Sequence, residues 1–365
     1  MRTVGVEEEL LLVDAESGEP RALSTAVLAA ASREAVREDK DEVFEEELQR
    51  EQLEFATRPH VSMRDIAEEI RNWRAEAARH AERVGGAVAA LATSPLPVSP
   101  SMGFGERHRW MGAKFGLTAQ EQLTSGCHVH VSVESDEEGV AVLDRIRPWL
   151  AVLMAMSANS PFWQGKDTRY GSYRSQVWGR WPSAGPVEVF GSPERYHAQV
   201  RDMLGTGVLR DEGMIYFDAR LSHRYPTVEI RVADVCLDPS TTVLLATLAR
   251  GLVETAAGEW QKGEPPAGHG VALLRMAEWQ AGRYGLEHEL MHPLTMRPAP
   301  AESVVRALLD HVKDALDATG DLVPARHGID ALLAGGNGAR VQRALLERTG
   351  NLRDVVTECV GLTQG

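Results

Sequence analysis

Acidic side chains interrupt an otherwise apolar stretch near the start of the chain, at Gly5-Val6-Glu7-Glu8-Glu9. Side chains alternate faces along a β-strand, so Glu7 and Glu9 share one face, while Glu8 lies on the apolar face with Val6. Two carboxylates side by side repel each other and lose hydration, and a divalent cation between them removes both penalties. Oxygen ligands of this kind suit Mg²⁺ or Mn²⁺. A solvated outer face is the alternative for this strand alone.

A second acidic segment lies at 43–57, VFEEELQREQLEFAT, and is expected to be extended with a break. Glu54 stands between Leu53 and Phe55, and a carboxylate in such an apolar setting needs a partner. Glu47 precedes it by seven positions. The other acids of the segment are expected at a solvated edge: Glu45, Glu46 and Glu51.

Two histidines alternate with valines at 124–133, TSGCHVHVSV, which predicts a strand with a clean two-residue period. His128 and His130 share the face opposite to Cys127, Val129 and Val131. Paired imidazoles on one face can bind a metal ion or contact phosphate and carboxylate oxygens. A structural hydrogen bond is the alternative for each histidine taken singly.

A hairpin is predicted at 214–222 and 227–235, MIYFDARLS and TVEIRVADV. Glu229 and Arg231 share a strand face, and Asp218 and Arg220 repeat the same acid–x–Arg spacing. An arginine among metal-ligating carboxylates makes sense if phosphate also binds there, because the guanidinium fork matches phosphate oxygens. A cross-strand ladder of salt bridges is the alternative.

These strands must be positioned by a sheet whose polar face gathers acids, histidines and arginines. Strands and helices do not alternate strictly along the chain, which favours an α+β fold over a doubly wound parallel sheet. No GxxxxGK[ST] loop and no strand–GxGxxG–helix unit occurs in the sequence, so a nucleotide would be held through metal and arginine. Helices are predicted at 63–92, 139–158, 240–261, 270–284 and 301–318, and loops at 93–102 and 159–193.

The composition sets limits on the partners of this 365-residue chain. Asp plus Glu number 53 against 39 Lys plus Arg, a net charge of −14 that should repel nucleic acid and anionic lipid. Three cysteines without a CxxC spacing predict neither a disulfide framework nor a thiolate zinc site. Glutamates interrupt the apolar N-terminus, and the most apolar stretch, 149–158, is too short for a bilayer. A soluble cytoplasmic protein is expected.

Five segments together resemble the bacterial ATP-dependent carboxylate–amine ligases related to glutamate–cysteine ligase. They occur in the family's order: GVEEELLLVD, LQREQLEFAT, TSGCHVHVSV, SANSPFWQGKDTRYGSYRSQVWGRWP and IYFDARLSHRYPTVEIRVADV. The tail segment WQAGRYGLEHEL at 279–290 is similar as well. Two departures are Phe217, where tryptophan is commoner, and Arg169, where glycine is usual.

The resemblance implies a glutamine-synthetase-like fold, in which helices cover one face of a curved antiparallel sheet. One catalytic domain is expected over 1–365, with a sheet-bearing part at 1–238 and a helical part at 239–365 packed on it. The resemblance also implies amino acid substrates and a homodimer.

The implied chemistry uses ATP with Mg²⁺ or Mn²⁺ to form an acyl phosphate, from which an amine displaces phosphate. The implied metal ligands are Glu7, Glu9, Glu47, Glu54, His128 and Glu229. Arg231 would contact the transferring phosphoryl group, with His130 or Asp218 as the general base. Arg174 would clamp a substrate carboxylate, with Tyr173 and Trp178 beside it.

Two other functions stay open at this point. The first is the same ligase chemistry on a different acid and amine in a specialised pathway. The second is a non-catalytic nucleotide-binding or regulatory protein on this fold. The acids at 7, 9, 54 and 229 are all present, which argues against a decayed site.

Overall fold

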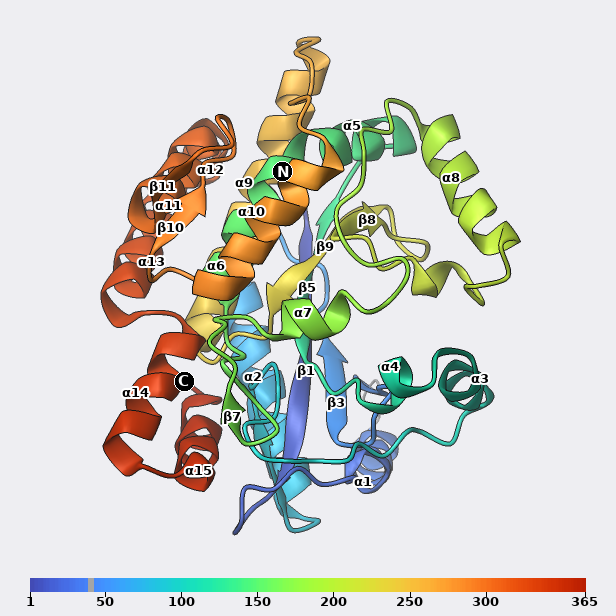
Figure 1. Cartoon of the computed structure of the whole chain (residues 1–365), viewed down its shortest axis with the longest axis vertical. Helices are drawn as coiled ribbons and strands as arrows, with labels where there is room; N and C mark the ends of the chain where they lie inside the picture. The colour runs from blue at the N-terminus through green and yellow to red at the C-terminus, as the bar shows by residue number, and fades with distance from the viewer. Residues whose placement is uncertain (39–42) are drawn as a thin grey trace.

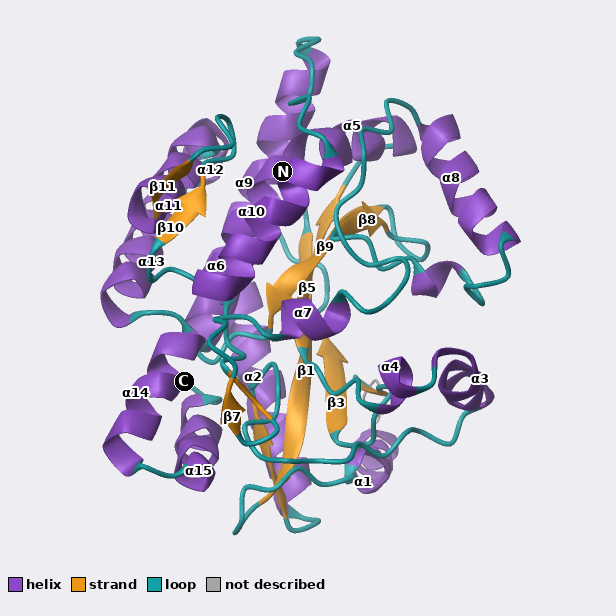
Figure 2. Cartoon of the chain, in the orientation of Figure 1, coloured by secondary structure: helices purple, strands orange, loops and turns teal. Residues whose placement is uncertain are grey.

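The architecture is an antiparallel sheet with helices packed around it, seen in a computed structural model that describes residues 1–38 and 43–365 (Figures 1 and 2). The main sheet has the strand order β2-β3-β1-β5-β9-β8, and β4 pairs with the far end of β1. Its strands are β1 (Val4–Asp14), β2 (Phe44–Glu46), β3 (Gln52–Ala56), β4 (Gly86–Ala89), β5 (Gly126–Ser132), β8 (Ala219–Leu221) and β9 (Thr227–Asp234).

The apolar face of the sheet packs against three helices, α2 (Met63–Glu82), α5 (Asp136–Ile146) and α9 (Pro239–Gln261). Helix α2 starts at residue 63, as predicted, where Ser62 accepts a hydrogen bond from the Asp65 backbone. Ile66 and Ile70, one turn apart, are fully buried. The expected α+β class, with helices over one face of an antiparallel sheet, is confirmed.

A buried ion pair joins the sheet to this helical layer. Glu8 is fully buried on the apolar face, and its two carboxylate oxygens accept hydrogen bonds of 2.7 Å from Arg74 Nε and Nη2. Arg74 also donates to the backbone carbonyls of Cys236, Leu237 and Thr363, so one side chain ties α2 to three distant segments. Burial of this acid among valines and leucines is possible because every donor and acceptor is used.

The predicted helix over 63–92 is too long. It ends at Glu82, and 86–89 instead forms β4 beside β1. Gly85 has a φ of 76°, the left-handed conformation that terminates helices and favours glycine. Val88 and Leu91 are buried, a pattern that fits a strand as well as a helix.

Several further elements differ from the prediction. The helix expected near 139–158 starts at Asp136 and breaks at Pro148 into α5, a 3₁₀ turn (Arg147–Trp149) and α6 (Leu150–Ser157). The loop at 159–193 is irregular as expected apart from two short strands, β6 (Phe162–Trp163) and β7 (Lys166–Asp167), and helix α7 (Arg174–Trp178). Arg169 in this loop has a φ of 66°, a left-handed conformation that is uncommon outside glycine. Four helices were not anticipated: α1 (Ser24–Glu38), α3 (Glu106–Phe115), α4 (Leu117–Gln120) and α8 (Pro193–Gly205).

The C-terminal part beyond α9 is helical, as predicted, and lies on one side of the molecule (Figure 1). It contains α10 (Val271–Tyr284), a short hairpin of β10 (Glu289–Met291) and β11 (Pro298–Pro300), α11 (Ala301–His311), α12 (Lys313–Thr319), α13 (Leu322–Gly335), α14 (Gly338–Thr349) and α15 (Leu352–Leu362). The largest buried apolar cluster runs from Val4 on β1 to Leu332 on α13, so both parts share one core. Within the described residues, no helix is long and apolar enough to cross a membrane.

Candidate active site

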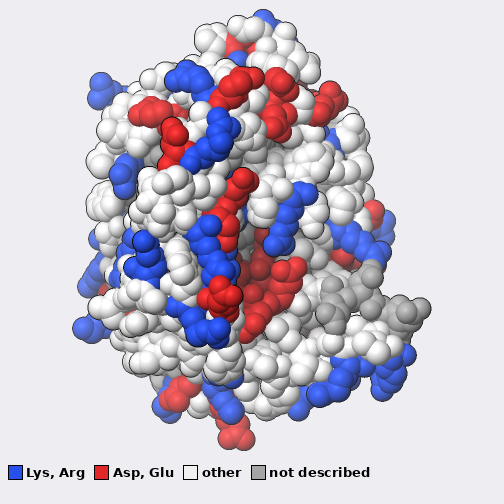
Figure 3. Space-filling model, turned by 90° about the vertical axis from the view of Figure 1, so that its right-hand side faces the viewer, with Lys and Arg blue, Asp and Glu red and all other residues white. Residues whose placement is uncertain are grey.

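A cavity of about 750 Å³ is hollowed into the polar face of the sheet. Its floor is formed by β1, β3, β5 and β9, and its rim by the loop before β3, the β8–β9 turn and helix α3. Figure 3 shows Asp and Glu side chains gathered in the hollow with Lys and Arg side chains around it. We call this the main cavity. It brings together most of the predicted site residues: Glu7, Glu9, Glu47, Glu54, His128, His130, Trp178, Glu229 and Arg231.

Strand register explains why these side chains meet. Glu7 lies opposite His128 across β1 and β5, and Glu9 lies opposite Glu54 across β1 and β3. His130 lies opposite Glu229 across β5 and β9. Because facing residues in an antiparallel pair are neighbours, four strands deliver one contiguous polar surface.

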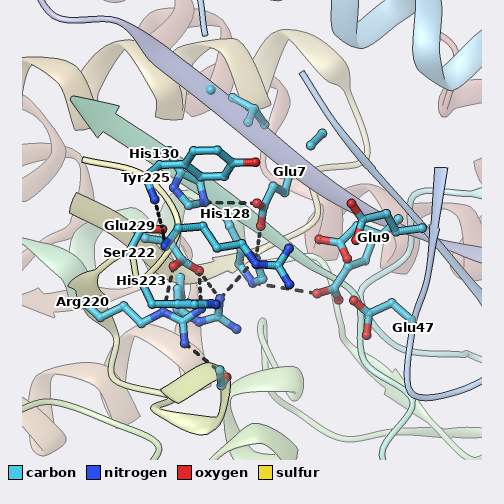
Figure 4. A pocket seen from close by; sticks show the side chains of 18 of the residues that line it. Glu7, Glu9, Glu47, His128, His130, Arg220, Ser222, His223, Tyr225 and Glu229 are labelled. Carbon is cyan, nitrogen blue, oxygen red and sulfur yellow. Dashed lines mark hydrogen bonds and ion pairs between the residues drawn. The ribbon is translucent and has the colours of Figure 1, made fainter. Parts of the chain in front are cut away.

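Glu7 sits between the two histidines (Figure 4). Its oxygens lie 3.1 Å from His128 Nδ1 and 3.2 Å from His130 Nε2. Burial alone would raise the pKa of Glu7, but the hydrogen bonds with His128 and His130 hold it well below its usual range. Burial and the nearby Arg231 charge lower the pKa of His128 to about 4, so its imidazole is neutral at physiological pH and free to act as a ligand.

Glu229 is held between two guanidinium groups. Arg220, on the neighbouring strand, donates from Nε and Nη2 at 2.7 and 3.1 Å, and Arg231 donates from Nη1. The pKa of Glu229, which burial would raise, is therefore held far below its usual range. The cross-strand salt bridge that was the alternative to phosphate binding is present, but it joins Glu229 to Arg220 on the neighbouring strand. Arg231 also reaches within 3.5 Å of His128 Nδ1.

Three acids of the cavity form a second group: Glu9, Glu47 and Glu54, which we call the acid cluster. Burial, and after it the charge of Glu47, raises the pKa of Glu9 to about 7 and that of Glu54 well above its usual range. One oxygen of Glu9 accepts a 2.7 Å hydrogen bond from the Gly126 backbone. The cluster thus concentrates negative charge where a cation would relieve it.

The donor set suits a divalent cation at more than one position. One carboxylate oxygen from each member of the acid cluster lies within 4.8 Å of the others. The same holds for Glu7 and Glu54 with His128, and for Glu7 and Glu229 with His130. Oxygen-rich sets with one imidazole fit Mg²⁺ or Mn²⁺. Because Glu229 already satisfies two arginines, the acid cluster and the Glu7–His128 pair are the better-suited positions.

Other predicted residues lie outside the main cavity. Asp218 and Arg174 line a second cavity behind Trp178. Tyr173 packs its ring near Trp163 and Tyr170 and lines neither cavity. Asp218 does not follow the strand alternation that was predicted for it, because β8 begins only at Ala219.

The expectation that Glu51 lies at a solvated edge is wrong. Glu51 is buried, and its carboxylate accepts hydrogen bonds from the Ser101 backbone. Glu45 and Glu46 are exposed as expected. Several cationic and aromatic residues of the cavity rim were not predicted, because they lie on loops without periodicity or on the unpredicted helix α3: Arg58, Arg107, His223, Arg224 and Tyr225.

Comparison with known proteins accords with this geometry. Residues 3–358 match the glutamate–cysteine ligase family 2. The chain belongs to this family. A Streptomyces avermitilis protein named "Putative glutamate--cysteine ligase 2-1" is 68% identical over 365 residues, with all of both chains covered. A Streptomyces coelicolor protein named "Putative glutamate--cysteine ligase 2" is 64% identical, covering all of this chain and 99% of its own.

The family's fold is shared with distant solved structures. The crystal structure of a glutamate–cysteine ligase from Francisella tularensis in complex with AMP superposes with a TM-score of 0.72 at 12% identity. The match covers all of this chain and 88% of that one. At this identity the likeness concerns the fold alone, and it agrees with the architecture that the family resemblance implies.

Proposed function

We propose that this member of the glutamate–cysteine ligase family 2 is an ATP-dependent carboxylate–amine ligase that works through an acyl phosphate. Family membership supports a ligase that acts on small molecules. The observation that carries the mechanism is the acid cluster beside Arg231: concentrated carboxylates and a buried guanidinium share one cavity. A metal–nucleotide complex matches both charges, since its cation suits the acids and its phosphates suit the arginine.

Mg²⁺ or Mn²⁺ would be held by the acid cluster and by Glu7 with His128, with Glu229 as a further candidate, and would neutralise charge on the phosphates of bound ATP. Arg231, fixed by Glu229, faces the same space and would contact the oxygens of the transferring phosphoryl group. Phosphoryl transfer needs little covalent help from a protein, so positioning and charge are the contributions expected of these residues.

The reaction balances in two steps. A substrate carboxylate oxygen attacks the γ-phosphorus of ATP, the bond to the β–γ bridging oxygen breaks, and ADP leaves. The nitrogen of an amine then attacks the carbonyl carbon of the acyl phosphate, and inorganic phosphate leaves. The nitrogen loses a proton in this step, and His130 in the main cavity is the better-placed acceptor, since Asp218 lies outside it.

Glutamate and cysteine are the substrates that we propose first, because of the family. The alternative of another acid and amine on the same chemistry stays open, as does a homodimeric assembly. The test measures ADP release with Mg²⁺ on a panel of acids and amines that includes L-glutamate and L-cysteine. Hydroxylamine in place of the amine should trap the acyl phosphate as a hydroxamate. ADP release without hydroxamate would contradict the mechanism, and ATP binding without any release would favour a regulatory protein.

A further inference from the structure

A second cavity of about 340 Å³ lies behind the main one, between α7, the loop after α7 and helix α10. Trp178 and Arg231 line both cavities, so the two adjoin at these side chains. The charged residues of the second cavity are two acids and three arginines besides Arg231: Asp218, Glu278, Arg174, Arg180 and Arg275. Charges of both signs in a small cavity are complementary to a zwitterion.

The acids of this cavity form a close pair from distant parts of the chain. Asp218 precedes β8 and Glu278 lies on α10, and their carboxyl groups interact directly. Burial raises the pKa of both, and the charge of Asp218 raises that of Glu278 further. Two buried carboxyl groups in contact either share a proton or hold a cation. Because Arg174 and Arg275 lie nearby, a small cation that carries its own negative group fits better than a metal ion.

One arginine of the second cavity, Arg174, has unused hydrogen-bonding capacity. Arg174 is only 2% exposed, and among the described residues its Nε has no partner. Its Nη atoms make only long contacts, 3.4 Å to the carbonyls of Val232 and Arg231. The nearest carboxylate, Asp234, is 3.9 Å away and already accepts hydrogen bonds from Ser160 and Ser172. A buried guanidinium with free donors calls for an anionic ligand.

We propose that the second cavity holds the α-amino acid end of the acid substrate, with its ammonium group on the Asp218–Glu278 pair and its α-carboxylate on Arg174. This inference rests on the proposed ligase function. The guanidinium carbons of Arg174 and Arg231 lie 5.5 and 5.9 Å from the Trp178 ring, so both cationic positions adjoin this ring. The carboxylate to be phosphorylated would extend past Trp178 toward Arg231.

Asp218 and Glu278 would then determine specificity. A plain carboxylic acid would leave the acid pair without its cation, whereas an amino acid satisfies both charges of the cavity. A hydrogen bond between two charged groups, such as an ammonium and a carboxylate, changes a dissociation constant about tenfold or more.

The test compares L-glutamate with glutarate, which has the same two carboxylates and lacks the ammonium group. Binding of each to the full chain is measured by calorimetry with Mg²⁺ and a non-hydrolysable ATP analogue. Wild type should bind L-glutamate about tenfold or more tightly than glutarate. Glu278→Gln should remove this preference by weakening L-glutamate alone. Asp218→Asn should also remove the preference for L-glutamate over glutarate. With two variants, the preference can still be measured if one of them fails to fold.

Glu287→Gln is the matched control, since Glu287 is exposed and lines neither cavity. The inference is wrong if Glu278→Gln and Asp218→Asn retain wild-type preference, if both ligands weaken equally, or if wild type binds neither ligand while it still binds the nucleotide. In that last case the nucleotide-binding half of the proposed function survives. Failure of wild type to bind the ATP analogue contradicts the proposed function, and the amino acid comparison still decides the inference.

Discussion

Arg231 and Arg220 share one carboxylate, and this sharing separates a catalytic from a structural role for Arg231. If Arg231 is replaced by alanine, Glu229 keeps its two hydrogen bonds from Arg220. We therefore expect Arg231→Ala to lower kcat by about 10²–10³, the contribution of one preorganised donor, with a smaller change in the KM for ATP and in Tm. Steady-state kinetics and a thermal melt measure these quantities.

Arg326→Ala is the control for this prediction, because Arg326 is exposed on α13 and lines neither cavity. A lowered Tm with kcat nearly intact in Arg231→Ala would return Arg231 to the salt-bridge alternative.

The acid cluster makes stability depend on both pH and metal. The pKa of Glu9 rises on folding to about 7 from an ordinary value of 4.5, so between these values the folded chain binds more protons than the unfolded chain. Without metal, the contribution of Glu9 to the free energy of unfolding is fully present below pH 4.5. It is lost as the pH rises through about 7. Saturating Mg²⁺ should therefore raise Tm more at about pH 8 than at about pH 5.5, by roughly 5 °C at the higher pH.

Differential scanning fluorimetry at the two pH values checks this expectation. Glu54→Gln should remove most of the Mg²⁺ effect, because it deletes a charged ligand of the cluster. Glu347→Gln, an exposed change on α14, should retain the effect. An equal Mg²⁺ response in Glu54→Gln would show that the cation binds elsewhere.

At the scale of elements, the Glu8–Arg74 pair holds α2 on β1. Arg74→Met would leave Glu8 buried without its cation, a change that costs about 3–5 kcal/mol of unfolding free energy. The double change Glu8→Gln with Arg74→Met should recover part of this loss, since no charge then stays unpaired. The denaturant midpoint of unfolding measures the stability of the single and the double variant. Arg71→Met, an exposed change on the same helix, is the control. If both variants match wild type, the pair contributes nothing to the attachment of α2.

At the scale of the whole molecule, the two parts of the chain should fold together. Helix α9 packs on β5, α2 and α5, and Leu248 and Leu252 on it are fully buried. A fragment of residues 1–238 lacks this layer, so we expect it to show no cooperative melt, whereas the full chain should show one transition in calorimetry. A fragment with its own sharp transition would instead divide the chain into two domains.

Alternation along single strands was predictable from the sequence, because it depends only on local geometry. The two-residue period of 5–9, 124–133 and 227–235 placed Glu7 with Glu9, His128 with His130, and Glu229 with Arg231. The family resemblance includes these segments and implied the curved antiparallel sheet covered by helices. The start of α2 at residue 63 was predictable for the same reason.

Which strands face each other was decided only by tertiary structure, since register depends on contacts between segments far apart in sequence. Strand register places Glu9 opposite Glu54. It also lets Arg220, as well as Arg231, donate hydrogen bonds to Glu229. The partner of Glu8 lies 66 residues away, and that of Asp218 lies on α10, so no local pattern could reveal either. Sequence by itself determined the residue types on each face, and packing decided which charges meet.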